Sequence, residues 1–321
     1  MRAMPNPVSA VAAVAQRYQS LFAEPAPRRL LLAATGSYVG DRLSTIALVA
    51  LSFDLGGGPE SVGVMLAMIM LPRLVLQGPA GALVDRYGGR RWLLPGTQRA
   101  MAAIASGSVL LTWLPSLLLL YLLAFVLAAG RTIDMPAFEV RLMTSVPRSQ
   151  RGAANAAHML AITIGDLCGP LLGGVLLTLL AAPVLFVLNG LSFVLLALAT
   201  WRTPLPFAAD RAETSDTQAS AGGYRWLIRQ REVALYALLT LTASALLLGT
   251  IALFAARAND LGMGERGVAF FYAAMGIGTL IGGTIAGGGV YSSRRSLAIA
   301  GAAAIASCMA QLAFGTTAIP I

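Results

Sequence analysis

The sequence contains no lysine, a single histidine and only two cysteines among its 321 residues. Charged residues make up 12% of the chain, too few to cover the surface of a soluble domain of this size. Cys168 and Cys308 lie within apolar segments, so we expect neither a disulfide framework nor a metal site. A phosphate-binding loop and a nucleophile–base arrangement are also missing from the pattern, and we therefore expect no cofactor and no enzymatic activity.

Apolar residues, by contrast, make up 57% of the chain and occur in blocks of about twenty residues. A helix of that length crosses the ~30 Å hydrocarbon core of a bilayer, and lipid allows only structures that satisfy their own backbone hydrogen bonds. The sequence therefore predicts an all-α, multi-pass membrane protein. We expect nine spans, at 30–53, 61–84, 93–114, 116–137, 153–179, 183–201, 233–256, 267–290 and 296–316.

The net charge of +9 is carried by arginines, and outside the predicted spans these lie in alternate segments, except in the seventh loop. There Arg257 and Arg266 are balanced by Asp260 and Glu265. The N-terminal tail and the second, fourth, sixth and eighth loops contain them, whereas the first, third and fifth loops contain none. The positive-inside rule then predicts a cell-membrane protein with a cytoplasmic N terminus, not a nucleic-acid-binding protein. The fourth loop is predicted to carry Arg141, Arg148 and Arg151.

The only long polar loop, 202–232, predicts a division of the chain. We expect a cytoplasmic tail at 1–29, a six-helix bundle at 30–201, a cytoplasmic linker at 202–232, and a partial bundle of three helices at 233–321. A shift of 204 residues also aligns Gly78 with Gly282 and Arg90 with Arg294, which favours duplicated halves.

The segment "GPAGALVDRYGGRR" leaves the second span through glycines, an aspartate and arginines. It resembles the loop between spans two and three of the major facilitator superfamily, although Gly89 departs from the basic residue usual at that position. The resemblance implies a gate between two halves of a transporter. A second interpretation stays open, in which these charges only set the topology. The residues that carry the resemblance are Gly81, Leu83, Asp85, Arg86, Gly88, Arg90 and Arg91.

A second glycine-rich segment, "GDLCGPLLGG", lies in the fifth span. Helical periodicity places Gly165, Gly169 and Gly173 on one stripe, where a neighbouring helix can approach closely, and Pro170 can bend the helix. Together with Gly174, this pattern resembles the antiporter motif of drug-exporting members. The segments "GSYVGDRLSTIAL" and "LPRLVL" resemble the branch with macrolide- and siderophore-type exporters. The resemblance implies export of hydrophobic or amphipathic small molecules coupled to protons.

Several ionisable residues fall deep within predicted spans, where a charge needs a cavity or a partner. At ~1.5 Å of rise per residue, Asp41, Arg73 and Asp166 lie about 16–20 Å from the cytoplasmic edge. We hypothesise that Asp41 and Asp166 carry protons, with Arg73 or Arg42 as counter-charge, because burial favours the neutral carboxyl and an arginine favours the carboxylate. A permanent ion pair between Asp41 and Arg73 is the alternative.

Other polar residues of the spans are predicted to have more local roles. Arg131 and Asp134, spaced i and i+3, are expected to pair in a structural or gating role. His158 is expected to be hydrogen-bonded within the helix packing, and Arg99 to extend toward the membrane surface. Asn189 either lines a cavity or links two helices, and the sequence leaves both open.

The resemblance implies twelve spans, whereas nine are predicted here. We expect a truncated gene product or fragment, with a complete chain that relies on a partner subunit or a second copy as the alternative. The expected function is proton-coupled efflux. A non-transporting membrane protein and an importer of the same superfamily remain as alternatives.

Overall fold

The computed structural model describes residue 16, residues 18–57, 59–88 and 90–203, and isolated positions between 230 and 309. The described residues up to 203 belong to one compact unit of the chain. The predicted tail up to residue 15, most of the linker and the spans at 233–256, 267–290 and 296–316 lie outside the described residues, apart from those isolated positions. The prediction of four chain regions therefore stays a prediction.

Six α-helices account for the six spans predicted between residues 30 and 201. Four of them, namely α3, α5, α7 and α6 with the turn before it, are long and apolar enough to cross a membrane. The helix α2 is 30 residues long and carries Asp41 and Arg42 near its middle. The helices are α2 (Pro25–Asp54), α3 (Pro59–Tyr87), α4 (Leu93–Gly107), α5 (Leu117–Ser145), α6 (Arg151–Leu179) and α7 (Ala182–Trp201), with 3₁₀ turns η1 (Ser108–Thr112) and η2 (Arg148–Gln150).

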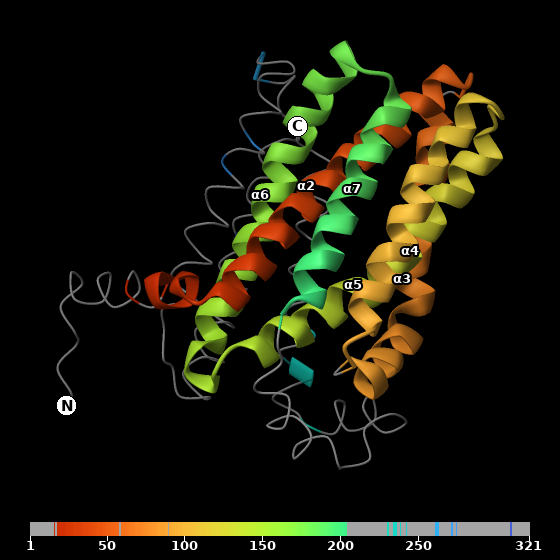
Figure 1. Ribbon diagram of the computed structural model, residues 1–321. Helices are drawn as coiled ribbons and strands as arrows, with labels where there is room; N and C mark the ends of the chain where they lie inside the picture. Colours follow the sequence, from red (N-terminus) through yellow and green to blue (C-terminus); the bar gives the residue numbers. More distant parts are fainter. Residues whose placement is uncertain are drawn as a thin grey trace. The chain divides into compact units, whose positions relative to one another are not determined.

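The helix α2 lies between α6 and α7 and packs closely against both (Figure 1). On the other side of the unit, α3 packs against α5, and α4 packs against α5 and α7. The buried side chains that fill these contacts are mainly leucine, alanine and phenylalanine. The charged middle of α2 therefore contacts other helices and is not surrounded by lipid alone.

The glycines of α6 permit the closest of these approaches. A Cβ at Gly165 would lie 2.6 Å from the Cβ of Tyr38, and one at Gly173 would lie 3.2 Å from that of Ile46. Gly169, between them, faces Arg42 in the same way, whereas a Cβ at Gly174 would meet nothing within 4 Å. The predicted stripe is thus confirmed as a packing surface, and it receives α2 at intervals of four residues.

Several boundaries differ from the prediction. The helix α2 begins at Pro25, within the predicted tail, α3 continues to Tyr87, and α4 ends at Gly107.

The largest shift is at the end of the fourth span. We expected the fourth span to end at 137 and Arg141 to lie in a loop, but α5 continues to Ser145 and the Arg141 side chain is buried. Its guanidinium donates hydrogen bonds to the carbonyl oxygens of Thr200 and Thr203, at 3.0 Å for the latter. Carbonyl oxygens at the end of a helix lack the usual amide donors of a following turn, and Arg141 supplies donors here, although Thr200 O also accepts a hydrogen bond from Thr203 N at 3.2 Å.

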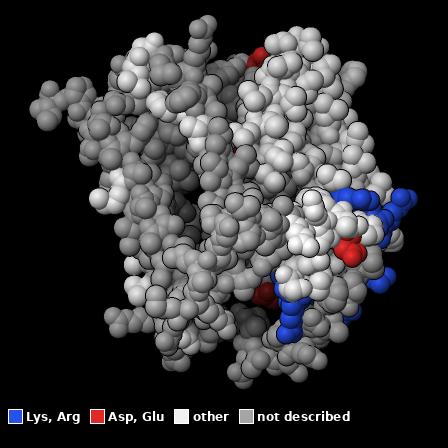
Figure 2. Space-filling model, turned by 90° about the vertical axis from the view of Figure 1, so that its left-hand side faces the viewer, with Lys and Arg blue, Asp and Glu red and all other residues white. Residues whose placement is uncertain are grey.

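Arginines gather at one end of the described helices. Consecutive helices run in alternating directions in Figure 1, so the segments after α3, α5 and α7 lie at the same end. Figure 2 shows blue side chains, with acidic side chains among them, toward this end of the described surface, and an acidic side chain without blue neighbours at the opposite end. Asp54 and Glu60, next to the short loop between α2 and α3, are exposed. The structure thus reproduces the predicted alternation of charge for the first six helices.

Candidate functional site

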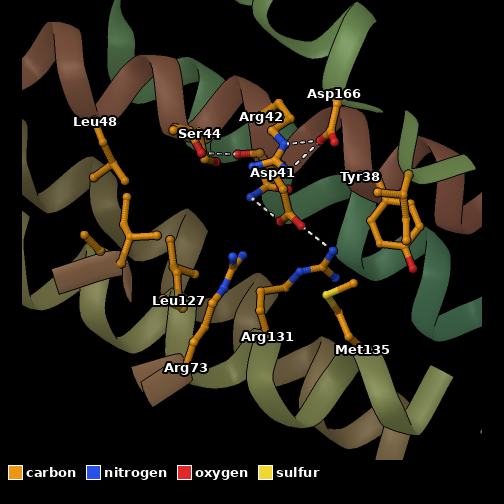
Figure 3. A pocket seen from close by; sticks show the side chains of 16 residues that line it. Tyr38, Asp41, Arg42, Ser44, Leu48, Arg73, Leu127, Arg131, Met135 and Asp166 are labelled. Atoms are coloured by element: carbon orange, nitrogen blue, oxygen red, sulfur yellow. Dashed lines mark hydrogen bonds and ion pairs between the residues drawn. The ribbon is translucent and has the colours of Figure 1, made fainter. Parts of the chain in front are cut away.

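A cavity of about 240 Å³ lies among α2, α3, α5, α6 and α7 (Figure 3). Its apolar wall includes Leu48, Ile69 and Leu127, and its polar wall is strongly charged. The five residues that were candidates for a cavity all line it, and Arg131 lines it as well. Those five are Asp41, Arg42, Arg73, Asp166 and Asn189. The charged and amide side chains at the cavity are Asp41, Arg42, Arg73, Arg131, Asp166 and Asn189.

Arg131 of α5 bridges two aspartates. Its Nη2 lies 2.6 Å from Oδ2 of Asp41 on α2, and its Nη1 lies 2.6 Å from Oδ2 of Asp134, one turn along α5. The Asp134 side chain is only 1% exposed and also accepts a hydrogen bond from Gln98 of α4. The predicted Arg131–Asp134 pair is therefore confirmed, and it forms part of a network that joins three helices.

The alternative of a permanent ion pair between Asp41 and Arg73 is wrong for this structure. The cation bound to Asp41 is Arg131, and Asn189 of α7 donates a long hydrogen bond to Asp41 Oδ1 at 3.5 Å. Asn189 therefore combines both roles that the sequence left open, because it lines the cavity and links α7 to α2. Sequence spacing could not choose among arginines on three helices, since the choice depends on how the helices are rotated.

A second ion pair lies closer to solvent. Arg42 of α2 places Nε at 2.6 Å and Nη2 at 2.5 Å from Oδ1 of Asp166 on α6. The side chains are 41% and 48% exposed, so this pair is more accessible than the Asp41–Arg131 pair, at 20% and 12%. Of the two arginines predicted as possible counter-charges, Arg42 forms the ion pair with Asp166, and Arg73 does not.

Arg73 of α3 points its guanidinium into the cavity, and no ion pair or hydrogen bond joins it to any described residue (Figure 3). Arg42 and Arg131 are the strongest charged influences on it, followed by Asp41 and Asp166. Both aspartates, however, are already bound to other arginines. The described cavity wall therefore holds three arginines and two aspartates.

Tyr38 and Gln98 are functional-site neighbours that sequence analysis did not identify. The Tyr38 ring lies under the Arg131 guanidinium at 5.0 Å, and its hydroxyl is 2.6 Å from Nε2 of His158. His158 is buried, as expected of a hydrogen-bonded packing residue. The signal that could have revealed both residues is a polar side chain within an apolar block, at a depth shared with a charged residue.

The glycine–aspartate–arginine segment forms the end of α3. A smaller hollow of about 220 Å³ is lined there by Gly81 and Asp85, with Pro136 and Glu139 of α5. A Cβ at Gly88 would collide with the Val84 carbonyl oxygen, which accepts a hydrogen bond from Gly88 N at 2.6 Å. A Cβ at Gly81 would meet nothing within 4 Å among the described residues, so no close helix approach depends on this glycine there. Arg86 stacks on the Tyr87 ring at 5.3 Å.

The arrangement suits the binding and exchange of small charged species. Carboxylates that face both an arginine and a cavity can exchange a bound cation for a proton if the helices shift. In the described part of the chain, no cluster of three His, Cys, Asp or Glu side chains has metal-binding geometry. The cavity's ion pairs come from α2, α5 and α6, so movement among these helices would change the partners.

Comparison of the amino-acid sequence with known proteins identifies a matching family. Residues 30–321 match the family model described as "Major Facilitator Superfamily". The chain is 27% identical over 164 residues, half of its length, to the "Putative multidrug resistance protein MdtD" of Citrobacter koseri. It is 32% identical over 162 residues, 49% of its length, to the "Probable anion transporter 3, chloroplastic" of Arabidopsis thaliana. The matches span only 34% and 30% of those proteins, about a third of each.

Proposed function

This chain belongs to the major facilitator superfamily of secondary transporters, and we propose that it exports hydrophobic or amphipathic small molecules in exchange for protons. In this proposal Asp41 and Asp166 carry the protons. Arg131 and Arg42 hold the two carboxylates charged in one state and release them in the other. The membrane is proposed to be the cell membrane, with the arginine-rich end of the helices in the cytoplasm.

One observation carries the coupling proposal: two carboxylates, each in an ion pair with an arginine of another helix, face the same cavity. An ion pair between two helices breaks when the helices separate, and an isolated carboxylate in a membrane then favours protonation. Such a pair therefore couples helix movement to proton uptake. The pair Arg42–Asp166 joins α2 to α6, and the pair Arg131–Asp41 joins α5 to α2.

Two observations favour the outward direction of transport. The glycine stripe of α6 resembles the antiporter motif of exporters, and one relative bears a name that refers to multidrug resistance. The stripe lies against the α2 segment that contains Arg42, so the packing surface and the proposed coupling residue are neighbours. An importer of the same superfamily is the alternative direction. A role as a subunit that does not transport by itself is the alternative function.

Transport by inverted membrane vesicles tests the proposal. We expect an acid interior to drive accumulation of amphipathic dyes by the wild-type chain, and Asp166→Asn and Asp41→Asn each to reduce that accumulation at least tenfold. Asp54→Asn is the matched control, because Asp54 is exposed beyond the cavity, at the end of α2. Full pH-driven accumulation by both cavity variants would contradict proton coupling. Uptake only into right-side-out vesicles would indicate an importer. Absence of uptake in both vesicle orientations would indicate a subunit that does not transport by itself.

A further inference from the structure

We propose that Arg73 binds the anionic group of the cargo, so that the cavity selects small amphipathic organic anions over neutral molecules of the same shape. The inference rests on the proposed transport role of this cavity and narrows its substrate class. It starts from the charges of the wall, where Arg42 binds Asp166, Arg131 binds both Asp41 and Asp134, and Arg73 binds no described residue.

Among the described residues Arg73 has no counter-ion, and a charge at membrane depth needs a partner or water. The positions of the two ion pairs leave Asp41 and Asp166 engaged elsewhere, so neither carboxylate is available to neutralise Arg73 in this state. Arg42 and Arg131 add positive potential around Arg73, and Asp41 and Asp166 offset part of it. An anion that enters the cavity would supply such a partner, which gives Arg73 a reason to prefer a negatively charged ligand.

The guanidinium also suits the chemistry of such a ligand. Its planar set of N–H donors matches the two oxygens of a carboxylate or the oxygens of a sulfonate. Figure 3 shows the Arg73 guanidinium pointing into the space between the labelled side chains, opposite the Arg42–Asp166 pair. The site is therefore placed to receive a charged group from the cavity side.

The rest of the wall sets the size and polarity of the ligand's body. Leu48, Ile69 and Leu127 provide apolar surface near Arg73, and the cavity of about 240 Å³ accommodates one or two fused rings. A ligand with an anionic head and a compact apolar body satisfies both parts of the wall. A neutral molecule of the same shape would bury against the apolar surface and leave Arg73 without a partner.

Equilibrium binding of 2-naphthoate and of its neutral amide, 2-naphthamide, tests the proposal with the full purified chain at pH 7.5. We expect the wild-type protein to bind the carboxylate at least tenfold more tightly than the amide. In Arg73→Gln this ratio should fall to about one through loss of naphthoate binding, with an intermediate ratio in Arg73→Lys. Arg29→Gln, an exposed residue near the start of α2, is the control and should keep the wild-type ratio.

Equal binding of the two compounds by the wild-type protein would overturn the proposal, as would an unchanged ratio in Arg73→Gln. The measurement is repeated in nanodiscs of phosphatidylcholine and of phosphatidylglycerol. If naphthoate binding disappears only in phosphatidylglycerol nanodiscs, Arg73 binds a lipid phosphate. That result would overturn its assignment to the cargo anion. No proton gradient is used, so a failure of proton coupling in the vesicle assay and a failure of anion selectivity remain distinguishable.

Discussion

Gly169 of α6 lies against Arg42 of α2, whose guanidinium binds Asp166, three residues earlier on α6. The stripe of small residues thus does more than let two helices approach. It allows a charged side chain on one helix to begin at the surface of the other and turn back to an aspartate one turn away. The close packing of α2 on α6 and the Arg42–Asp166 ion pair both depend on the absence of a side chain at Gly169.

The substitution Gly169→Ala should disturb both. Its Cβ would overlap the Arg42 Cβ, so α2 must move away and the Arg42–Asp166 pair must lengthen. Overpacking of this kind costs about 1–3 kcal/mol, and we expect a lower melting temperature in detergent with impaired transport. Gly174→Ala is the control, because its Cβ meets nothing within 4 Å and alanine favours a helix. Equal melting temperatures for the two variants would refute the packing argument.

Arg131 should be more important to stability than either aspartate it binds. Arg131→Gln leaves Asp41 and the buried Asp134 without their cation, and breaking a buried pair in this way costs about 3–5 kcal/mol. The double variant Arg131→Gln/Asp134→Asn removes one of the stranded charges. We expect it to recover at least part of the lost thermal stability. A double variant less stable than Arg131→Gln would show that charge compensation is not the main role of Arg131.

Arg141 is predicted to be a structural residue of the α5–α7 contact. Arg141→Met keeps the length and apolar stem of the side chain but leaves the carbonyl oxygens of Thr200 and Thr203 without this donor. Loss of hydrogen bonds to buried partners costs about 1–3 kcal/mol. Thermal unfolding in detergent should show this loss, while Arg28→Gln, at an exposed arginine, should behave like the wild type. A wild-type melting temperature for Arg141→Met would contradict the assignment.

The orientation of the helices can be tested with single cysteines. In a background of Cys168→Ser and Cys308→Ser, we expect Asp54→Cys to react with a membrane-impermeant maleimide added to intact cells. Arg90→Cys should react only after the membrane is permeabilised, because the arginine-rich end is predicted to face the cytoplasm. Both positions are exposed at opposite ends of the helices. The reverse labelling pattern would invert the topology and, with it, the proposed direction of transport.

The amino-acid sequence alone determined the class of protein and the positions of its charges along the helices. Apolar blocks of membrane-spanning length specify helices, because lipid accepts no other open structure, and the six helices between Pro25 and Trp201 follow those blocks. The glycines of α6 were identifiable as one face by periodicity, and Asp41, Arg73 and Asp166 as deep charges by residue count. The end of α5 was missed, because the apolar pattern weakens at Arg141 while the helix continues.

Only the tertiary structure decided which charges are partners. Arg42, Arg73 and Arg131 lie on α2, α3 and α5, and their sequence positions give no preference among the aspartates. The rotation of each helix and the close contact at Gly169 bring Arg42 to Asp166 and Arg131 to Asp41. The same geometry leaves Arg73 facing the cavity without a described partner. Charge pairing acts over a few ångströms, and separations that short between helices arise from side-chain packing, which the periodicity of one chain segment does not encode.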